Sequence, residues 1–274
     1  VLFLGQLTLF LTLERWREGA EKVCQTPFNI LLLGVDEPNL DDQGELERPR
    51  TDTMLFLAFR PQQGKLALFS IPRDSLIDIP GHGMERINMA HVYGGYDLTK
   101  ELVEKIMEMP VDRYLMVNYQ SFEGIVDLVG GVEITVDKRM LYQDQSAGLL
   151  IDLQPGTQIL TGDQALGYVR YRRDALGDIT RTRRQQQFMT ALAGKIKEPA
   201  TLLRVLRQWR TALRISKEYL RTDLQLPELL GLFLSFKGLD LGASLETYTL
   251  PGEFSGPYWR LHPREIEQLT AAYR

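Results

Sequence analysis

The sequence has one cysteine, three histidines and no apolar run of about 20 residues, the length that spans a bilayer. One cysteine excludes an internal disulfide but does not fix the redox compartment. The histidines lack the spacing of a zinc motif such as His-Glu-x-x-His, so we interpret them as loop or core residues. The net charge of −4 and the isoelectric point near 5.6 argue against a nucleic-acid partner, because such proteins usually carry a basic excess.

Arginine, in contrast, is concentrated in one segment. Residues 170–184 contain six arginines, although the chain as a whole is slightly acidic. A guanidinium is a planar fork of donors that binds phosphate or carboxylate through two hydrogen bonds. Several forks in one place predict a ligand with more than one negative charge. The alternative is a solvated surface.

Helical spacing within this segment favours the binding interpretation. Apolar residues from Phe188 onward recur at helical intervals, which predicts a helix from about Thr180. On such a helix Arg181, Arg184 and Gln185 share one face with Phe188, so two forks and an amide point the same way.

A second helix is predicted just before the arginine segment. The turn at Pro155-Gly156 precedes an N-capping residue, either Thr161 or Asp163. Arg170 and Arg172 would then leave the end of this helix and reach the same site.

Two aspartates stand at the ends of short apolar runs. Asp36 follows the run 30–35 and Asp52 precedes the run 54–59, and both runs are typical of buried strands. Open α/β sheets bind ligands at strand ends, where two carboxylates can hold one Mg²⁺ and leave positions for phosphate oxygens. The alternative is that one of the two aspartates is a loop residue and the other an N-capping residue, and that they bind no metal.

More polar residues follow the next strand, which we expect at 65–71. Pro72 fixes the direction of the chain, so Arg73 and Asp74 leave the strand at the same edge of the sheet. Downstream, Arg86 and Asn88 supply a cation and an amide, and the Gly-Gly pair that follows would let the backbone approach a ligand closely.

With these motifs in view, the chain resembles the LytR-CpsA-Psr family of cell-envelope glycopolymer transferases. Each motif is weak alone, but five of them in the family's order form a specific signal. The motifs are Gly34-x-Asp36, Arg50-Thr-Asp-Thr53, Ile71-Pro-Arg-Asp-Ser75, Arg86-Ile-Asn88 before Tyr-Gly-Gly, and Arg170-x-Arg172 followed by Gly-Asp-x-x-Arg181-x-x-Arg-Gln-Gln. The resemblance extends from Asn29 to about Gln187, and the segment after about residue 190 resembles the family only loosely.

The resemblance implies a role for each matching residue. Asp36 and Asp52 would ligate Mg²⁺ or Mn²⁺, while Arg50 and Arg73 would contact a pyrophosphate. The phosphate site would be completed by Arg170, Arg172, Arg181 and Gln185, with Asp178 beside them. Together with the residues chosen for their position, the expected catalytic residues are Arg50, Asp52, Arg73 and Asp74. The expected substrate-binding residues are Arg50, Arg73, Arg86, Asn88, Arg170, Arg172, Asp178, Arg181, Arg184 and Gln185.

The activity implied by the resemblance is transfer of a glycopolymer from a polyprenyl pyrophosphate carrier to a hydroxyl of peptidoglycan or another envelope glycan. A metal and several arginines suit such a pyrophosphate better than a covalent nucleophile does. Asp74 or an acid of the metal pair would accept the hydroxyl proton. The lipid predicts an elongated apolar cavity that opens within a few ångströms of Arg73, Arg170 and Arg172.

Two other functional classes stay open. The first is a binding module that holds a lipid-linked polymer without transferring it, for which the arginines alone would suffice. The second is a transcriptional regulator, but no helix-turn-helix pattern with a basic recognition helix is evident.

Alternating strands and helices predict an α/β fold, a central mixed β-sheet flanked by helices as an αβα sandwich. We expect a helix at 97–109, strands at 114–117 and 132–136, and helical leucine spacing from Glu198 to Leu234. The apolar residues 1–13 fit the outer end of a transmembrane anchor or an amphipathic helix on the core, and we favour the anchor. The expected division is a segment 1–26 and a catalytic domain 27–274, held at the cell membrane by a single span on its extracytoplasmic side.

Overall fold

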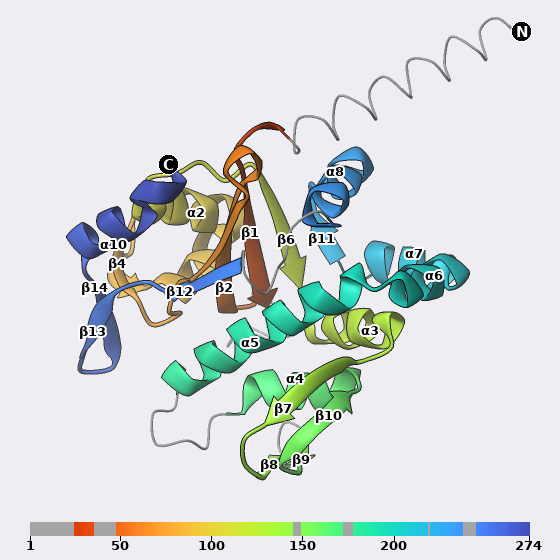
Figure 1. Ribbon diagram of the computed structural model, residues 1–274. Coiled ribbons are helices and arrows are strands. Elements are labelled where there is room, and N and C mark those ends of the chain that lie inside the picture. Colours follow the sequence, from red (N-terminus) through yellow and green to blue (C-terminus); the bar gives the residue numbers. More distant parts are fainter. Residues whose placement is uncertain (1–24, 36–47, 145–148, 172–177, 219, 238–244) are drawn as a thin grey trace, which may run out of the picture.

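A computed structural model describes residues 25–35, 48–144, 149–171, 178–218, 220–237 and 245–274 of the protein (Figure 1). Its centre is a six-stranded sheet with the strand order β11-β6-β1-β2-β3-β12. These strands are β11 (Leu220–Thr222), β6 (Arg113–Val117), β1 (Phe28–Val35), β2 (Thr51–Arg60), β3 (Lys65–Ser70) and β12 (Leu245–Thr249). β1 pairs in parallel with β6 and antiparallel with β2, and β3 pairs in parallel with β12. The predicted mixed sheet and α/β class are therefore confirmed.

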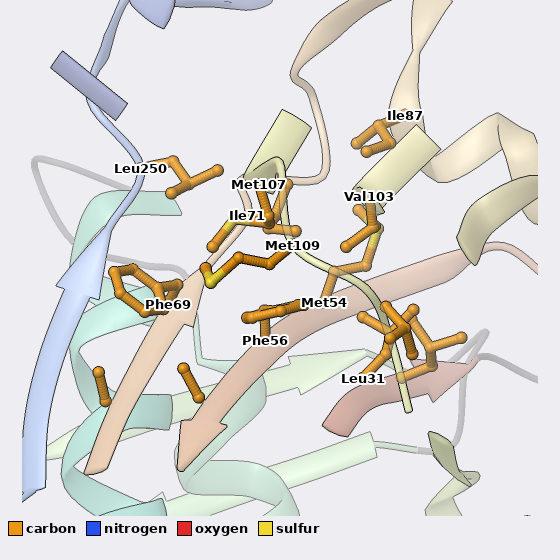
Figure 2. Close-up of a cluster of buried hydrophobic side chains, with 14 of the residues drawn as sticks. Leu31, Met54, Phe56, Phe69, Ile71, Ile87, Val103, Met107, Met109 and Leu250 are labelled. Atoms are coloured by element: carbon orange, nitrogen blue, oxygen red, sulfur yellow. The ribbon is translucent and has the colours of Figure 1, made fainter. Parts of the chain in front are cut away.

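Two helices, α2 (Ala90–Met107) and α10 (Pro263–Thr270), cover one face of the sheet. Side chains alternate between the two faces of a strand, so Leu31, Leu33 and Val35 of β1 all point toward these helices. Figure 2 shows the resulting core, in which side chains of β1, β2 and β3 meet Val103 and Met107 of α2.

The other face of the sheet meets α5 (Asp178–Lys197) and α8 (Leu226–Lys237). The alternate residues of β1, Ile30 and Leu32, pack here against Leu232 of α8 and Ala193 of α5. Helices on both faces make the three-layer αβα sandwich that the sequence predicts (Figure 1).

A smaller group of elements packs beyond α5 around a second core (Figure 1). It consists of α3 (Tyr119–Val129), α4 (Gly162–Arg170), the pair β7 (Val132–Val136) with β10 (Gly156–Leu160), and the pair β8 (Met140–Asp144) with β9 (Leu149–Leu153). Asn118 caps α3 by accepting a 2.9 Å hydrogen bond from the backbone N–H of Ser121. Of the two expected N-capping residues of α4, Thr161 is the one that takes this position, and Asp163 lies in the first turn. Phe188 of α5 joins this core.

The remaining elements lie at the periphery. They are the hairpins β4 (Leu76–Ile79) with β5 (Gly83–Arg86) and β13 (Gly252–Ser255) with β14 (Tyr258–Leu261), the helices α6 (Pro199–Arg207) and α7 (Trp209–Glu218), and the 3₁₀ turns η1 (Pro61–Gln63), η2 (Ile87–Met89) and η3 (Ala271–Tyr273). Among the described residues, no helix combines the length and apolar composition needed to cross a bilayer. The apolar residues 1–13 lie outside those residues.

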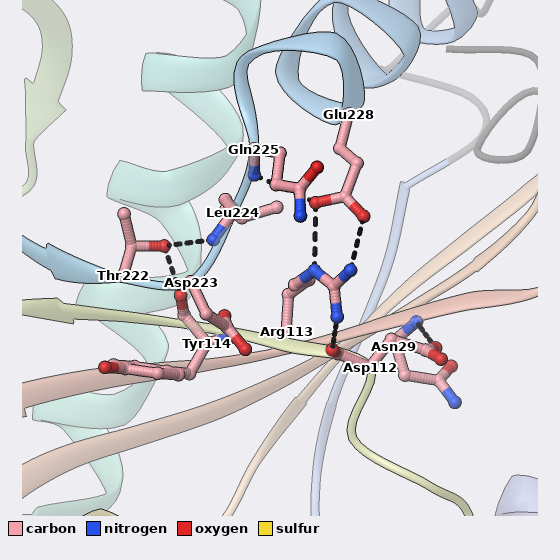
Figure 3. Close-up of polar contacts among 9 residues, drawn as sticks. All are labelled: Asn29, Asp112, Arg113, Tyr114, Thr222, Asp223, Leu224, Gln225 and Glu228. Atoms are coloured by element: carbon pink, nitrogen blue, oxygen red, sulfur yellow. Dashed lines mark hydrogen bonds and ion pairs between the residues drawn. The ribbon is translucent and has the colours of Figure 1, made fainter. Parts of the chain in front are cut away.

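The leucine-rich stretch 198–234 is not continuously helical, which corrects the expectation. β11 interrupts it because Tyr114 at the open edge of β6 bonds on both sides: its N–H donates to Asp223 and its carbonyl accepts from Thr222 (Figure 3). Arg113 then donates to both carboxylate oxygens of Glu228 in α8, at 2.9 and 2.7 Å. Pairing with an available sheet edge outweighs local helix propensity here.

Helix α2 begins earlier than the expected 97–109 and includes the Gly-Gly pair. Gly95 has φ 66° and ψ −151°, a conformation that glycine tolerates and that kinks the helix. Thr99 donates a 2.8 Å hydrogen bond to the carbonyl of Gly95. These glycines shape a helix and do not line the ligand cavity described below, so the expectation of close backbone approach is wrong.

Candidate active site

The site forms at the end of the sheet where β1 and β6 finish and β2 begins. Gly34 of β1 lies opposite Thr53 of β2 and Val117 of β6. The next pair along β1 and β2 is Val35 with Thr51, so Asp52 is the extra residue of a β-bulge. A bulge re-aims its side chain, and Asp52 consequently lines the cavity at this edge.

Ion pairs connect Asp52 to the end of the next strand. Nη1 of Arg73 lies 2.7 Å from Oδ1 of Asp52, and Nε of Arg73 lies 3.6 Å from Oδ2 of Asp74. Nε of Arg86 lies 3.3 Å from the other carboxylate oxygen of Asp74. The Arg86 guanidinium also lies over the ring of Tyr258, 5.3 Å from its centroid. Acids and arginines thus alternate along one wall of the site.

The turn at Pro72 holds this wall in place. Ser75 donates from its backbone N–H and from its Oγ to the Pro72 carbonyl, at 3.0 and 2.6 Å, and is fully buried. Ser75 therefore supports the turn. The N–H of Asn88 donates to the carbonyl of Arg73 at 3.2 Å. Its Oδ1 is buried beside the cavity and has no hydrogen-bond partner among the described residues.

The opposite wall comes from α3, α4 and α5. Arg170, the last residue of α4, lies over the ring of Tyr119 at 4.2 Å, a cation–π contact that fixes its guanidinium. Arg181 is buried in the second turn of α5. Gln185, one turn further, donates a 3.0 Å hydrogen bond to Oγ1 of Thr53, which joins α5 to β2 at the bulge.

Between these walls lies a cavity of about 800 Å³, a typical volume for a ligand site. One end is polar, and the described residues there are Arg50, Asp52, Arg73, Asp74, Arg86, Asn88, Asn118, Arg170, Arg181 and Gln185. The rest is apolar, and the described residues there include Leu32, Leu55, Leu115, Val117, Phe122, Ile125, Val126, Leu166, Val169, Phe188, Met189, Leu192 and Ile196.

Helix α5 carries this change from charged to apolar along one stripe. Its lining residues are Arg181, Gln185, Phe188, Met189, Leu192 and Ile196, and each lies three or four residues from at least one other. At 1.5 Å per residue, the stripe from Arg181 to Ile196 is about 22 Å long. The elongated apolar cavity expected beside Arg73 and Arg170 is therefore confirmed.

The polar end carries excess positive charge. Among the described residues it holds five arginines, at 50, 73, 86, 170 and 181, against two aspartates, at 52 and 74. Neighbouring apolar walls keep the local dielectric low, which strengthens attraction for an anion. The arrangement suits a ligand with several negative charges at one end and a long apolar body.

Most of the predicted site residues meet in this cavity. Those that line it are Arg50, Asp52, Arg73, Asp74, Arg86, Asn88, Arg170, Arg181 and Gln185. Asp36 and Arg172 lie outside the described residues, as does the side chain of Asp178, so their contribution stays a prediction.

Arg184 is the exception, and its expected direction is wrong. It is 4% exposed, donates a 2.6 Å hydrogen bond from Nη1 to the Tyr171 carbonyl and lies over the Tyr171 ring at 5.2 Å. Burial lowers the pKa of its guanidinium. At 100° per residue, the centre of the cavity stripe lies about 90° from Arg184, which explains why Arg181 reaches the cavity and Arg184 does not.

Asn118 and Tyr119 are polar lining residues that sequence reasoning did not single out. They directly follow β6, and Val117 at its end pairs in parallel with Gly34. A strand at 114–117 was predicted, but its parallel pairing with β1 was not. That pairing is the signal that would have placed both residues at the same sheet edge as Asp52.

The oxygen donors at the polar end can be compared with what Mg²⁺ needs. In the part of the chain that the structure describes, no three His, Cys, Asp or Glu gather into a metal-binding group. Mg²⁺ usually binds through one or two carboxylates and completes its shell with water and substrate phosphates. Asp52, Asp74 and the unpartnered Oδ1 of Asn88 are hard oxygen donors at one end of the cavity, so the donor type fits this mode of binding.

Comparison with known proteins bears on this geometry. A model of the LytR_cpsA_psr family matches residues 15–273. The chain belongs to the LytR-CpsA-Psr family. The match continues past residue 190, so the similarity covers the C-terminal part as well as the motifs.

Individual relatives and solved structures support the same family assignment. The chain is 31% identical over 247 residues to the polyisoprenyl-teichoic acid–peptidoglycan teichoic acid transferase TagT of Bacillus subtilis, which covers 88% of this chain and 74% of that protein. The structure of TagT bound to LIIa-WTA has a TM-score of 0.74 and 30% identity, covering 92% of this chain and 91% of that one. The family protein YwtF (TagT) with bound octaprenyl pyrophosphate lipid has a TM-score of 0.66 and 28% identity, covering 92% and 90%.

Proposed function

We propose that this chain is a phosphotransferase that moves a glycopolymer from a polyprenyl pyrophosphate carrier to a hydroxyl of peptidoglycan or another cell-wall glycan. The observation that carries the proposal is the continuity of one cavity, with arginines at one end and an apolar wall behind them that runs about 12 Å along α5, from Phe188 to Ile196. This division matches a pyrophosphate joined to a polyprenyl chain. The names of the family relatives, and the octaprenyl pyrophosphate bound by one of them, support the same donor.

In the proposed reaction the acceptor hydroxyl oxygen attacks the phosphorus that bears the sugar. The bond from that phosphorus to the bridging oxygen breaks, and polyprenyl phosphate leaves with the electron pair. A phosphodiester to the acceptor forms, and the hydroxyl proton goes to the carboxylate of Asp52 or Asp74. Arg73, Arg170 and Arg181 stabilise the negative charge that grows on the leaving phosphate. If the acceptor is water, the same step gives a pyrophosphatase side activity.

Asp74 has a second task in this proposal. Its two carboxylate oxygens meet different arginines, Arg73 at 3.6 Å and Arg86 at 3.3 Å. A side chain that bridges two guanidinium groups restricts their rotation, so both forks stand ready before the substrate enters.

A divalent cation, Mg²⁺ or Mn²⁺, is part of the proposal. Asp36 and Asp52 would hold it, with the substrate phosphates and water completing the oxygen shell. When bound, the metal would supply charge neutralisation on the pyrophosphate. Support comes from the bulge that turns the Asp52 side chain into the cavity, and from the position of Asp36 directly after Val35, the last residue of β1.

The decisive experiment uses the protein with a defined polyprenyl-pyrophosphate-linked oligosaccharide and a peptidoglycan acceptor. We expect release of polyprenyl phosphate together with a covalent acceptor product, with both requiring Mg²⁺ and both stopped by EDTA. Binding of the donor without release of polyprenyl phosphate would instead identify the chain as a binding module. Release that is insensitive to EDTA would remove the metal from the mechanism.

We also propose that the domain works at the cell membrane on its extracytoplasmic side, held by a single N-terminal span. Two arguments support this location. A polyprenyl carrier resides in a bilayer, and its glycan acceptor lies outside it. Protease accessibility of the domain in intact spheroplasts, compared with a cytoplasmic marker, tests the location directly.

A further inference from the structure

Helices α6 and α7 carry an exposed apolar surface that the proposed reaction does not use. They follow one another closely, joined at Gln208, and pack beside α3 and the C-terminal end of α5 (Figure 1). Leu206 is 69% exposed and Trp209 is 54% exposed. The exposed apolar residues of this surface are Leu203, Leu206, Trp209 and Leu213. Large apolar side chains gathered on adjacent helices indicate an interaction surface.

The same two helices are basic. Residues 199–218 contain five basic side chains and one acidic one, while the chain as a whole has a net charge of −4. The basic residues are Arg204, Arg207, Arg210, Arg214 and Lys217. Each helix also has a buried side, at Thr201 in α6 and Ile215 in α7. A short amphipathic helix with leucine, tryptophan and several arginines is typical of segments that lie in the interface of an anionic membrane.

This surface lies next to the apolar end of the cavity. Ile196, at the apolar end of the cavity, is itself 38% exposed and stands just before α6. On α3, Ile125 lines the cavity, and its neighbour Gly124 packs so closely on α7 that a Cβ there would lie 3.1 Å from Cδ1 of Ile215. The exposed helices therefore adjoin the end of the cavity that is farthest from the arginines.

We infer that α6 and α7 dock the domain on an anionic lipid bilayer, with the apolar end of the cavity facing the membrane. A polyprenyl chain then passes from the bilayer into the cavity without crossing water, and its pyrophosphate comes to rest between Arg73 and Arg181. The lipid donor in this inference rests on the proposed function. The docking itself rests only on the exposed apolar and basic side chains.

Vesicle sedimentation tests the docking with the full chain. Wild type is mixed with vesicles of phosphatidylcholine alone or with phosphatidylglycerol added. We expect binding that rises with phosphatidylglycerol content, and at least tenfold weaker binding for Leu206→Glu combined with Trp209→Glu. The matched control is Met84→Glu, which changes a residue that is 61% exposed on β5, in the hairpin with β4. Vesicle binding by segments that are identical in all variants contributes equally to each, so it cancels in this comparison.

Charge is tested separately. Replacing Arg207 and Arg210 by Gln removes two cations, and at about 1 kcal/mol each this lowers affinity for the anionic vesicles on the order of thirtyfold. Arg264→Gln on α10 is the control, because this exposed arginine lies on a helix on the other side of the sheet. The control removes one cation, so a loss of about fivefold there would be the same loss per charge. That result would show that only total charge matters and would overturn the docking surface.

A second readout separates failure of the docking from failure of the proposed function. Cleavage of a water-soluble donor with a short prenyl chain should proceed at the wild-type rate in the Leu206→Glu, Trp209→Glu variant, whereas vesicle-bound long-chain donor is cleaved at least tenfold more slowly. Wild-type vesicle binding without any cleavage would overturn the transferase and leave the docking. Vesicle binding unchanged in the variant, or burial of these helices in a dimer seen by sedimentation equilibrium, would overturn the docking.

Discussion

Arg73 donates a 2.7 Å hydrogen bond from Nη1 to Oδ1 of Asp52. The acid is the bulge residue next to the start of β2, and the arginine follows Pro72, just beyond the end of β3, so the pair ties two neighbouring strand ends together. Both side chains are partly exposed, and a pair of this kind contributes only about 0–1 kcal/mol to stability. The pair instead fixes the direction of a guanidinium fork at the polar end of the cavity.

Replacement of Asp52 by Asn should separate activity from stability. We expect donor cleavage to fall about a hundredfold or more, because the proposed metal loses a charged ligand and Arg73 loses its anchor. The melting temperature should change by only about 2–4 °C or less, since a partly exposed pair adds little stability. Asp78→Asn, at an exposed acid of β4, is the control and should keep full activity. Wild-type activity in Asp52→Asn would end the metal hypothesis.

Arg181 and Arg184 are both buried in α5, but replacement by lysine should lower activity at Arg181 and stability at Arg184. Lysine keeps the charge and loses the fork, so Arg181→Lys should lower kcat/KM about ten- to a hundredfold, or 1.4 to 3 kcal/mol. Arg184→Lys should leave kcat/KM within about threefold and lower the melting temperature, because its fork bonds the Tyr171 carbonyl.

Arg139 supplies the control for this pair. It forms an exposed ion pair with Asp152 outside the cavity, at 3.3 Å. Arg139→Lys should change neither kcat/KM nor the melting temperature appreciably. Steady-state kinetics and thermal melts of the three variants check all of these outcomes. A loss in Arg139→Lys equal to that in Arg181→Lys would mean that bulk charge, and not the fork, matters.

The part of the site that local sequence determines could be predicted. Short apolar runs bounded by turn residues gave β1, β2 and β3, and strand ends then located Asp52 and Arg73. Helical periodicity gave α5 and the shared face of Arg181 and Gln185. In each case the structure is decided by interactions between residues that are only a few positions apart in the sequence.

The errors arose where distant parts of the chain decide the structure. Asn118 and Tyr119 reach the site only because β6 pairs in parallel with β1, a contact over more than 80 residues. Residues 220–222 form a strand because the edge of β6 is open to them. Arg184 lies one turn from Arg181 on a helix packed on two sides, and its neighbour Tyr171 decides which side it takes.

His91 gives the protein a predictable response to acid. It is buried, and its Nδ1 lies 2.7 Å from the carbonyl oxygen of Pro49, next to Arg50 of the site. Burial lowers the pKa of His91, and the nearby Arg48 adds to this effect. In the unfolded chain the pKa is about 6.5, so below that pH the unfolded state binds a proton that the native state resists. The free energy of unfolding therefore falls as the pH drops below about 6.5.

Urea denaturation at several pH values checks this sign. Between pH 7 and about pH 5 the wild type should lose more stability than His91→Gln, which cannot titrate. Differences between the two proteins cancel the contribution of carboxylates that titrate in the same range. Parallel pH profiles would show that His91 takes up its proton as easily in the native state as in the unfolded chain.

The length of the lipid chain should control affinity until the cavity is filled. Each additional buried methylene contributes about 0.8 kcal/mol, so Kd for polyprenyl phosphates should fall steeply with prenyl number and then level off. Leu192 lines the cavity between the arginines and Ile196, and Leu192→Trp should block the passage at that point. Short prenyl phosphates, which need only the polar end, should then bind as in wild type, while long chains lose their advantage. Leu203→Trp, on the exposed side of α6, should bind both as wild type does. Wild-type affinity that is equal for short and long chains would mean that the substrate is a soluble polyanion, and the apolar wall from Phe188 to Ile196 would then need another explanation.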